Sequence, residues 1–348
     1  MRYIPYGKQY IDKTDIRSVL NILKGPIITT GKEVQKFEEK ITKFLGSKFS
    51  TTCNSGTSAL FLALQSIEVK ENDVIIMPAI NFIASYNVSK LFKAKIFLAD
   101  VNKDTGQMSP SNVVELCKKF KLKKIKAIIT MYNGGYPENA EKFKQLKKKY
   151  GCYIIEDACH AFGAKYKSKN RYIKIGSCYH SDISTFSLHP VKTLTTGEGG
   201  IVTTNSKKLD KKIKRHRSLG IKKNLKKHWS YDVDHIGLNF RLSDFQCALG
   251  ISQLKKVSKF LSFRKKIFFN YQKMLKNIPN IKLPSHKKKY ISSNHLFIVN
   301  LNKPNLNLKE KLIKFILKNK IILQYHYIPI YKFKIFKKKY INKNAEIY

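Results

Sequence analysis

Between about residue 45 and residue 205, short β-branched runs alternate with helical stretches. This alternation is typical of a parallel sheet with helices on both faces. The pattern predicts strands at residues 74–77, 95–99, 127–131, 153–156, 183–186 and 201–204, and helices at 57–65, 84–92, 140–150 and 207–218. Ligands of open parallel sheets bind at the carboxyl ends of the strands, so the residues that follow these strands are the first candidates for a functional site.

The pattern changes after residue 240. Residues 241–275 have apolar positions at helical spacing over a long stretch, which predicts a connecting helix. Predicted strands at 296–301 and 321–326 flank a predicted helix at 309–318. We therefore expect an α/β protein with a large domain at 1–240, built on a mostly parallel central sheet, followed at 241–348 by the connector helix and a small α+β C-terminal domain. A chain of 348 residues has the length for such a division.

Composition adds a formal net charge of +45, almost all of it from lysine spread along the chain. A nucleic-acid surface concentrates Lys and Arg on one element and adds aromatic residues for stacking, so we expect no nucleic-acid partner. The field would still favour an anionic substrate. The chain has no apolar stretch of the roughly 20 residues that a membrane helix needs, and its start lacks the pattern of a secretory signal. We expect a cytoplasmic protein without a membrane partner.

The six cysteines are dispersed and form no Cys-x-x-Cys pair, so a disulfide framework is not expected. A cluster of potential zinc ligands matches no common ligand spacing, and we expect no metal site there. Its members are Cys152, Cys159, His160, Cys178 and His180.

Three segments carry candidate chemistry. In the first, the small polar turn at residues 54–59 leads into an apolar helix, and Gly56 and Thr57 would let backbone N–H groups approach a phosphate. An ordinary helix cap explains this turn equally well. In the second, Asp157 ends an apolar strand, where a carboxylate can hold a pyridinium nitrogen protonated or can cap a helix.

The third segment, residues 186–200, places Lys192 in a turn between a strand and a Gly-rich stretch. In a lysine-rich chain, the simplest interpretation is an exposed side chain. The order of the segments argues against it: a phosphate turn is followed by a strand-end Asp157 and, 35 positions later, by Lys192, with Ser187 five residues before the lysine. Enzymes that use pyridoxal 5'-phosphate (PLP) hold it through a Schiff-base lysine and an Asp partner.

With these motifs, the sequence resembles the DegT-type sugar aminotransferases, which are fold-type I PLP enzymes. The resemblance runs from Ile4 to Tyr348 and is most specific at residues 187–200. Supporting segments are Ile4-Pro5-Tyr6-Gly7, Ile28-Thr29-Thr30-Gly31, Gly237-Leu238-Asn239-Phe240-Arg241-Leu242, Ser293-Asn294-His295-Leu296 and Gln324-Tyr325-His326-Tyr327-Ile328-Pro329.

The resemblance implies a role for each matching residue. Lys192 would be the Schiff-base lysine and proton shuttle, and Asp157 the partner of the pyridine nitrogen. The remaining cofactor positions are Phe82, stacked on the ring, His160, beside the ring, Gly56, Thr57 and Ser187 at the phosphate, and Asn239, which would reach the cofactor phosphate of a neighbouring subunit in a homodimer. The expected substrate positions are Tyr6, Pro26, Ile27, Ile28, Thr29, Gln324, Tyr325, His326 and Tyr327. Without the resemblance, Tyr6 is an anchor of the N-terminus and His326 a core histidine.

The implied activity is amination of the C4 ketone of a UDP-linked 4-keto-6-deoxy-N-acetylhexosamine by L-glutamate, in the biosynthesis of pseudaminic acid or a related surface glycan. Three alternatives remain: an aminotransferase for another nucleotide-linked 3- or 4-keto sugar, a sugar dehydratase of the same fold, and a non-catalytic regulator. The dehydratases replace the lysine by histidine, which Lys192 argues against. The chain departs from the family pattern at Leu188, commonly Phe, in the short stretch 220–231 and at its end, where relatives continue and where we expect a truncation.

Overall fold

The computed structural model describes residues 3–224, 229–303, 305–336 and 341–348. Its α-helices are α1 Lys13–Leu23, α2 Lys32–Leu45, α3 Gly56–Ser66, α4 Ile83–Leu91, α5 Pro110–Lys119, α6 Lys144–Tyr150, α7 Lys207–Arg217, α8 Asp244–Leu275, α9 Leu306–Lys318 and α10 Lys343–Ile347. Its strands are β1 Phe49–Cys53, β2 Val74–Pro78, β3 Lys95–Ala99, β4 Ala127–Met131, β5 Tyr153–Asp157, β6 Lys165–Ser168, β7 Arg171–Lys174, β8 Ile183–Ser187, β9 Gly200–Thr204, β10 Ile221–Lys223, β11 Tyr231–Val233, β12 Ile281–Lys282, β13 Tyr290–Ile291 and β14 Asn300–Leu301.

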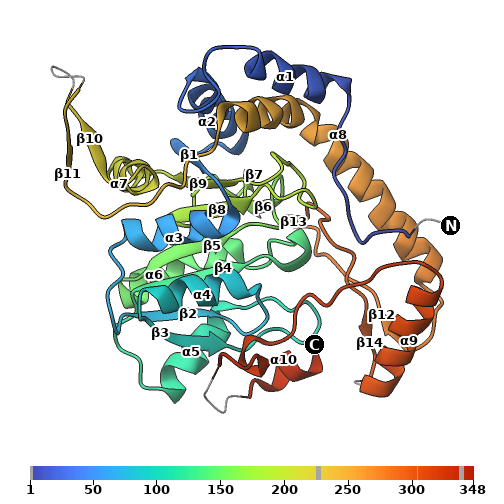
Figure 1. The fold of residues 1–348 in the computed structure, drawn as a ribbon. Coiled ribbons are helices and arrows are strands. Elements are labelled where there is room, and N and C mark those ends of the chain that lie inside the picture. The colour runs from blue at the N-terminus through green and yellow to red at the C-terminus, as the bar shows by residue number, and fades with distance from the viewer. Residues whose placement is uncertain (1–2, 225–228, 304, 337–340) are drawn as a thin grey trace.

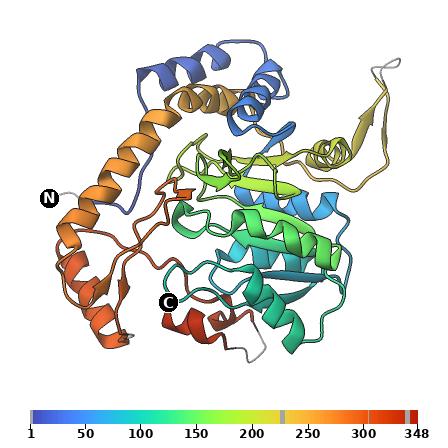
Figure 2. The ribbon, with the colours of Figure 1, turned by 180° about the vertical axis from the view of Figure 1, so that it is seen from behind.

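The centre of the molecule is a seven-stranded sheet in the order β1-β9-β8-β5-β4-β2-β3 (Figure 1). Strands β8, β5, β4, β2 and β3 run parallel to one another, whereas β9 is antiparallel to both β8 and β1. Figures 1 and 2 show helices on both sides of this sheet. The predicted α/β architecture with a mostly parallel sheet is confirmed, and the six strands predicted between residues 74 and 204 all form, each within one residue of its predicted bounds.

The central sheet is stabilised because the side chains on both of its faces are buried. Strand β4 is buried at every position, as expected for a central parallel strand. Successive side chains point to opposite faces, so Ile129 lies in the core shared with α3 and α4, while Ile128 lies in the core shared with α5 and α6. A third core packs β8 and β9 against α2 and α8. These layers fix the strand ends in space.

Helix α8 links two regions of the molecule. Figures 1 and 2 show it running from beside α1 and α2 to the segment that holds β12, β14 and α9. It begins at Asp244, three residues later than the helical pattern starts, because Ser243 and Gln246 form a capping box there. In its first half, Lys256 pairs with the fully buried Asp15 of α1 (Nζ to Oδ2 2.5 Å). This pair anchors α1 on α8.

The C-terminal part differs most from the expected elements. Helix α9 forms, but the predicted strand at 296–301 is reduced to the two residues of β14. The strand predicted at 321–326 was wrong: Ile321 makes only an isolated bridge to Ile4, and Asn133 supplies a side-chain donor to the carbonyl of His326. Without a neighbouring strand along its length, this segment takes its hydrogen bonds from side chains and loops.

The helix predicted at 140–150 is interrupted. It starts as a 3-10 turn, Ala140–Lys142, and continues as α6 from Lys144. Asn139 before the turn has a left-handed backbone (φ 64°), and Tyr290 accepts the backbone N–H of Asn139 at 2.9 Å. Tertiary contacts therefore set the start of this element.

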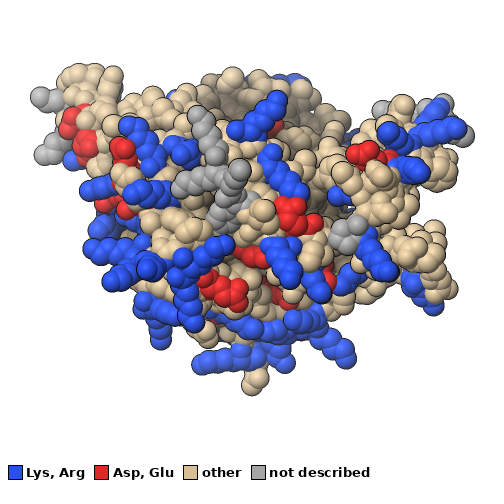
Figure 3. Space-filling model, turned by 90° about the horizontal axis from the view of Figure 1, so that it is seen from below, with Lys and Arg blue, Asp and Glu red and all other residues tan. Residues whose placement is uncertain are grey.

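The surface view from below shows lysine and arginine side chains spread over the visible face and interleaved with acidic and uncharged residues (Figure 3). This distribution agrees with the spread of lysine along the sequence. In the parts of the chain that the structure describes, no helix is both long enough and apolar enough to span a bilayer.

Candidate active site

The phosphate turn lies where β1 leads into α3. Ser55 caps this helix by accepting the N–H of Ser58 at 3.0 Å. Gly56, the first helical residue, lies so close to the end of β8 that a Cβ on it would meet the Cβ of Ser187 at 2.8 Å. This close approach brings the Ser187 hydroxyl to a helix N-terminus, where backbone N–H groups have no helical partner. The Ser187 hydroxyl and these backbone N–H groups together form a cradle that suits a phosphate.

Asp157 ends β5, next to Thr185 of β8 in the register. Its side chain is buried. Oδ2 accepts the hydroxyl of Ser85 at 3.1 Å, and Oδ1 accepts the backbone N–H of Cys159 at 3.2 Å. Two neutral donors fix the carboxylate without neutralising it, so its charge remains available to a cationic group placed beside it.

Lys192 is half-buried in the turn that follows β8. Burial lowers the pKa of its amine, and the nearby guanidinium of Arg264 acts in the same direction, while the carboxylate of Asp157 opposes them. A lysine with a lowered pKa is a better nucleophile and base at neutral pH. Lys192 therefore combines a lowered amine pKa with the buried carboxylate of Asp157 nearby.

A group of three histidines lies beside Lys192. His160 and Tyr327 share a hydrogen bond (Nε2 to Oη 2.9 Å), and the His160 ring lies 4.4 Å from that of His295 and 6.2 Å from that of His326. Burial lowers the pKa of His160 and of His295 well below the ordinary value, and the Lys192 amine adds to the effect. Both imidazoles are therefore neutral at pH 7. Within the described residues, Nδ1 of each ring is buried without a partner.

Two more expected residues reach this group. Phe82, at the start of α4, is 53% exposed, and its ring lies 5.9 Å from that of Tyr327. The ring of Tyr6 lies 6.0 Å from that of His326. An exposed aromatic face next to buried polar groups is suited to stacking on a flat ligand.

The remaining expected residues make their contacts, among the residues that the structure describes, outside the group formed by Lys192 and the three histidines. Residues 26–29 form the loop between α1 and α2, and Ile28 accepts the N–H of Asp244 at 2.9 Å. The Tyr325 ring faces α9, because the Lys309 amine lies 4.2 Å from its centre. Thr57 and Asn239 are exposed. The neighbour of Asn239, Phe240, accepts the N–H of Asn54 at 2.9 Å, which places Asn239 next to the phosphate turn.

Four residues of the site were not predicted from the sequence: Ser85, Asn133, Arg264 and His295. Ser85 is an ordinary helical position of α4 by pattern, and Arg264 precedes two lysines in a run typical of a solvated helix face. His295 lay within a segment that supports the resemblance, which was the one available signal. Their contacts join residues far apart in the chain, 72 positions for Ser85 with Asp157 and 193 for Asn133 with His326.

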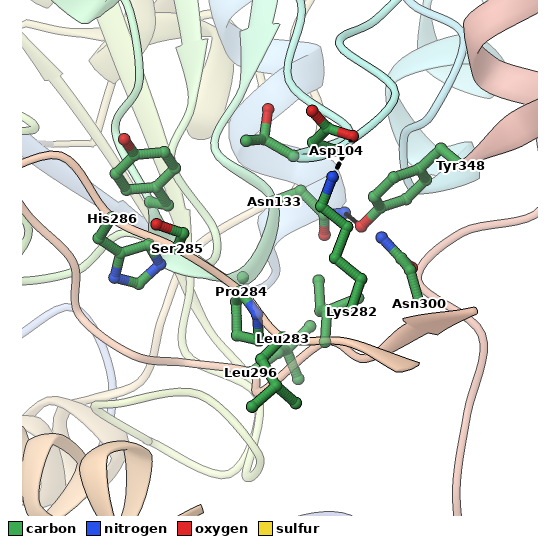
Figure 4. A pocket seen from close by; sticks show the side chains of 14 residues that line it. Asp104, Asn133, Lys282, Leu283, Pro284, Ser285, His286, Leu296, Asn300 and Tyr348 are labelled. Carbon is green, nitrogen blue, oxygen red and sulfur yellow. Dashed lines mark hydrogen bonds and ion pairs between the residues drawn. The ribbon is translucent and has the colours of Figure 1, made fainter. Parts of the chain in front are cut away.

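A pocket opens between Asp104 and the paired strands β12 and β14, with His286 and Asn133 among its lining residues (Figure 4). Lys282 forms an ion pair with Asp104 across it (Nζ to Oδ1 2.5 Å). Asn133 donates to the hydroxyl of Tyr348 at 3.0 Å and also to the carbonyl of His326 at 2.9 Å. The pocket therefore adjoins the Lys192 site and shares Asn133 with it.

All six cysteines are free. Among the residues that the structure describes, no group of three or more His, Cys, Asp or Glu side chains is arranged to hold a metal ion. Burial raises the pKa of the half-buried Cys159 thiol well above its ordinary value, with the Asp157 carboxylate adding to the effect. This thiol is therefore protonated at neutral pH and is no nucleophile.

Comparison with known proteins identifies the family. Residues 9–347 match the DegT/DnrJ/EryC1/StrS aminotransferase family. The chain belongs to this family. A UDP-4-amino-4,6-dideoxy-N-acetyl-beta-L-altrosamine transaminase from Campylobacter jejuni subsp. jejuni serotype O:23/36 is 39% identical over 344 residues, covering 96% of this chain and 86% of the relative. The chain is thus a PLP-dependent aminotransferase.

Solved structures of the family agree. Helicobacter pylori PseC, an aminotransferase involved in the biosynthesis of pseudoaminic acid, superposes with a TM-score of 0.90 at 31% identity and covers 100% of this chain and 92% of that one. The PLP form of the putative sugar aminotransferase Spr1654 from Streptococcus pneumoniae superposes with a TM-score of 0.84 at 25% identity, covering 96% and 87%. The fold-type I prediction and the PLP cofactor are confirmed.

The residues of this site fit the cofactor. The close approach of Gly56 to Ser187 places the Ser187 hydroxyl beside the α3 N-terminus, which suits a phosphate. The buried carboxylate of Asp157 suits a protonated ring nitrogen, and the unpartnered Nδ1 of His160 suits a polar ligand. Lys192, half-buried and with a lowered pKa, suits a covalent bond to an aldehyde.

Proposed function

We propose that this enzyme transfers the amino group of L-glutamate to the C4 ketone of a UDP-linked 4-keto-6-deoxy-N-acetylhexosamine, in the biosynthesis of pseudaminic acid or a related surface glycan. The match to the Campylobacter jejuni transaminase along nearly the whole chain carries this proposal. The Helicobacter pylori neighbour supports it independently through the fold. The positive charge of the chain favours both a diphosphate and a dicarboxylate.

In this proposal, four residues hold the cofactor phosphate: Gly56 and Thr57 through their backbone N–H groups, Ser187 through its hydroxyl, and Asn239 of a second copy through its amide. The helix N-terminus at α3 adds a favourable dipole. Asn239 serves across a homodimer, which its exposure and its place next to the phosphate turn support.

Asp157 and Phe82 hold the ring. Bound PLP supplies an electron sink for the carbon that loses a proton. Asp157 would hold the ring nitrogen protonated through its negative charge, and Ser85 and the N–H of Cys159 fix the buried carboxylate in place. Phe82 would cover one face of the ring, and His160, which stays neutral and is fixed by Tyr327, would lie beside it.

Lys192 moves the proton. With the cofactor bound to the substrate, the Lys192 amine would be free to accept the proton from the substrate carbon bonded to nitrogen and to donate it to the cofactor carbon on the other side of that nitrogen. Burial lowers the pKa of this amine, which increases the fraction of the basic form at neutral pH. The same residue serves both half-reactions, with glutamate as the first partner and the keto sugar as the second.

We propose that the sugar nucleotide contacts Tyr6, residues 26–29 and residues 324–327. The half-buried His326 lies between Tyr6 and Tyr327 in the ring contacts, which supports this end of the pocket. We also propose that residues 1–240 form the cofactor domain and residues 241–348 the connector and small domain, and that the enzyme acts in the cytoplasm.

The test is product formation. Purified protein with PLP, L-glutamate and the UDP-4-keto sugar should yield the 4-amino sugar and one equivalent of 2-oxoglutarate, measured by mass spectrometry and a coupled assay. Lys192→Ala should form neither, whereas Lys43→Ala, at an exposed lysine of α2, should match the wild type. A clear preference for a GDP- or dTDP-linked keto sugar would reject the substrate part of the proposal.

A further inference from the structure

We propose that Arg264 binds a carboxylate group of the amino-acid donor at the reacting end of the pocket. This inference rests on the proposed function and deepens it, because it assigns the recognition of the donor to one residue of α8. Its evidence is the position of the guanidinium, its unmatched charge and the chemistry of the two substrates.

Arg264 reaches from α8 to both loops that carry the chemistry. Its Nη1 donates to the carbonyl of His295 at 3.1 Å, and its Nη2 lies 3.4 Å from the carbonyl of Val191, the residue before Lys192. His295 in turn packs against His160, with ring centres 4.4 Å apart. The guanidinium therefore lies between the turn of Lys192 and the histidine group.

The positive charge of Arg264 has no matching carboxylate in the described part of the chain. Its side chain is half-buried, and burial lowers the pKa of its guanidinium. By contrast, the charge of Arg217 is paired, because its Nη1 forms an ion pair with Oε1 of Glu38 at 2.5 Å. Buried charges in proteins are paired or bound to ligands. A guanidinium has five N–H donors, and the two carbonyls accept from only two of its nitrogens.

The local charge balance calls for an anion. Burial lowers the pKa of the Lys192 amine, and the nearby Arg264 guanidinium lowers it further, so two cationic side chains lie close together here. Asp157 supplies the nearby negative charge, and it is committed to the ring nitrogen of the cofactor. A carboxylate matches the planar fork of a guanidinium and accepts two parallel hydrogen bonds from it.

Chemistry distinguishes the donor from the nucleotide. The α-carboxylate of an amino acid is bonded to the carbon from which Lys192 takes the proton. The diphosphate of the sugar nucleotide is separated from C4 by the hexose ring. A cation next to Lys192 is therefore placed for the donor, and its loss should affect one half-reaction and spare the other.

Rapid mixing tests this selectivity, because the visible absorbance of lysine-bound PLP follows each half-reaction alone. In Arg264→Met, the second-order rate constant for L-glutamate should fall about 10- to 100-fold, the range for a lost hydrogen bond to a charged group. The reaction of the aminated enzyme with the keto sugar should keep the wild-type rate. Arg264→Lys should recover part of the loss, and Lys265→Met, which removes the next cation of α8, should change neither.

Ligand binding gives a second measurement that needs no turnover. By calorimetry, glutarate should bind Arg264→Met about tenfold or more weakly than the wild type, while UDP binds both equally. If Arg264 only clamps the loops, both half-reactions fall together and the inference is wrong. It is equally wrong if the sugar half-reaction alone is lost or if neither changes. Should Arg264→Met fail to fold, Arg264→Lys decides by the same two measurements.

The proposed function fails separately. If the wild-type enzyme reacts with L-glutamate but aminates no UDP-linked keto sugar, the substrate proposal is wrong, and the donor half-reaction still tests Arg264.

Discussion

Replacing Gly56 by alanine tests the phosphate cradle, because this substitution adds one carbon where the structure leaves no room. The new Cβ would lie 2.8 Å from the Cβ of Ser187 and 3.3 Å from its Cα and Oγ. Carbon atoms in contact are about 3.5–4.0 Å apart, so Ser187 must move by several tenths of an ångström or more. Gly56 is the first residue of α3, so helix propensity alone favours alanine.

The two effects oppose each other in the free energy of unfolding. Overpacking costs about 1–3 kcal/mol, whereas Gly→Ala in a helix gains about 0.5–1 kcal/mol. We expect Gly56→Ala to lose up to about 2 kcal/mol. Displacement of the Ser187 hydroxyl should also remove one charge-assisted hydrogen bond to the phosphate, which corresponds to about 10- to 100-fold weaker binding of PLP.

The assay is PLP titration by absorbance, together with urea unfolding of the protein without PLP. Gly56→Ala with Ser187→Gly should regain part of the stability lost in the single variant but not the affinity, because the contacts with the Ser187 side chain and its hydroxyl are gone while the 3.3 Å approach to its Cα remains. Gly7→Ala serves as the control, since its Cβ would meet the nearest atom, in Val191, at 3.7 Å. If Gly56→Ala raises the free energy of unfolding by about 0.5–1 kcal/mol and binds PLP like the wild type, the close approach of Gly56 to Ser187 is contradicted.

Three further predictions follow from buried ionisable groups. Asp157→Asn should keep the visible PLP band but lose on the order of 100-fold in kcat; steady-state rates within about threefold of wild type would contradict the role of its charge. His295 stays neutral when folded because burial lowers its pKa, so acidification below about pH 6.5 protonates only the unfolded form and destabilises the protein. His295→Phe should reduce this pH slope, by up to about 1.4 kcal/mol per pH unit in urea titrations, and equal slopes would refute the assignment. Burial raises the pKa of Glu156, so the free energy of unfolding of the wild type falls as pH rises through that pKa. Glu156→Gln removes the ionisable group, so its free energy of unfolding minus that of the wild type should be larger at pH 8 than at pH 4. The same difference at both pH values would contradict this prediction.

Much of the central sheet could be predicted from the sequence. Strands such as Ala127–Met131 are short, β-branched and bounded by turns, so periodicity locates them. The amphipathic helix α2, with Phe37, Ile41 and Leu45 buried on one face, offered the same kind of signal but was not predicted. The segment 321–326 has the apolar residues of a strand, yet strands form only where a partner strand is available, which depends on tertiary structure.

The site was predictable only in part for a related reason. Gly56, Asp157 and Lys192 follow strand ends, and the parallel sheet brings those ends to one edge. Ser85 and Arg264 reach the same edge from the sides of helices, where local sequence resembles any other helical face. Their roles depend on which residue lies opposite, 72 positions away for Ser85 and Asp157.

Chemical labelling of the lysine that carries PLP tests the central claim most directly. Borohydride reduction of the purified enzyme with PLP fixes the cofactor covalently to its lysine, and peptide mass spectrometry then locates the adduct. We predict a single modified peptide that contains Lys192, despite the 68 lysine and arginine residues of the chain, and no specific adduct in Lys192→Ala. A stoichiometric adduct on another lysine, or one that persists in Lys192→Ala, would contradict the account.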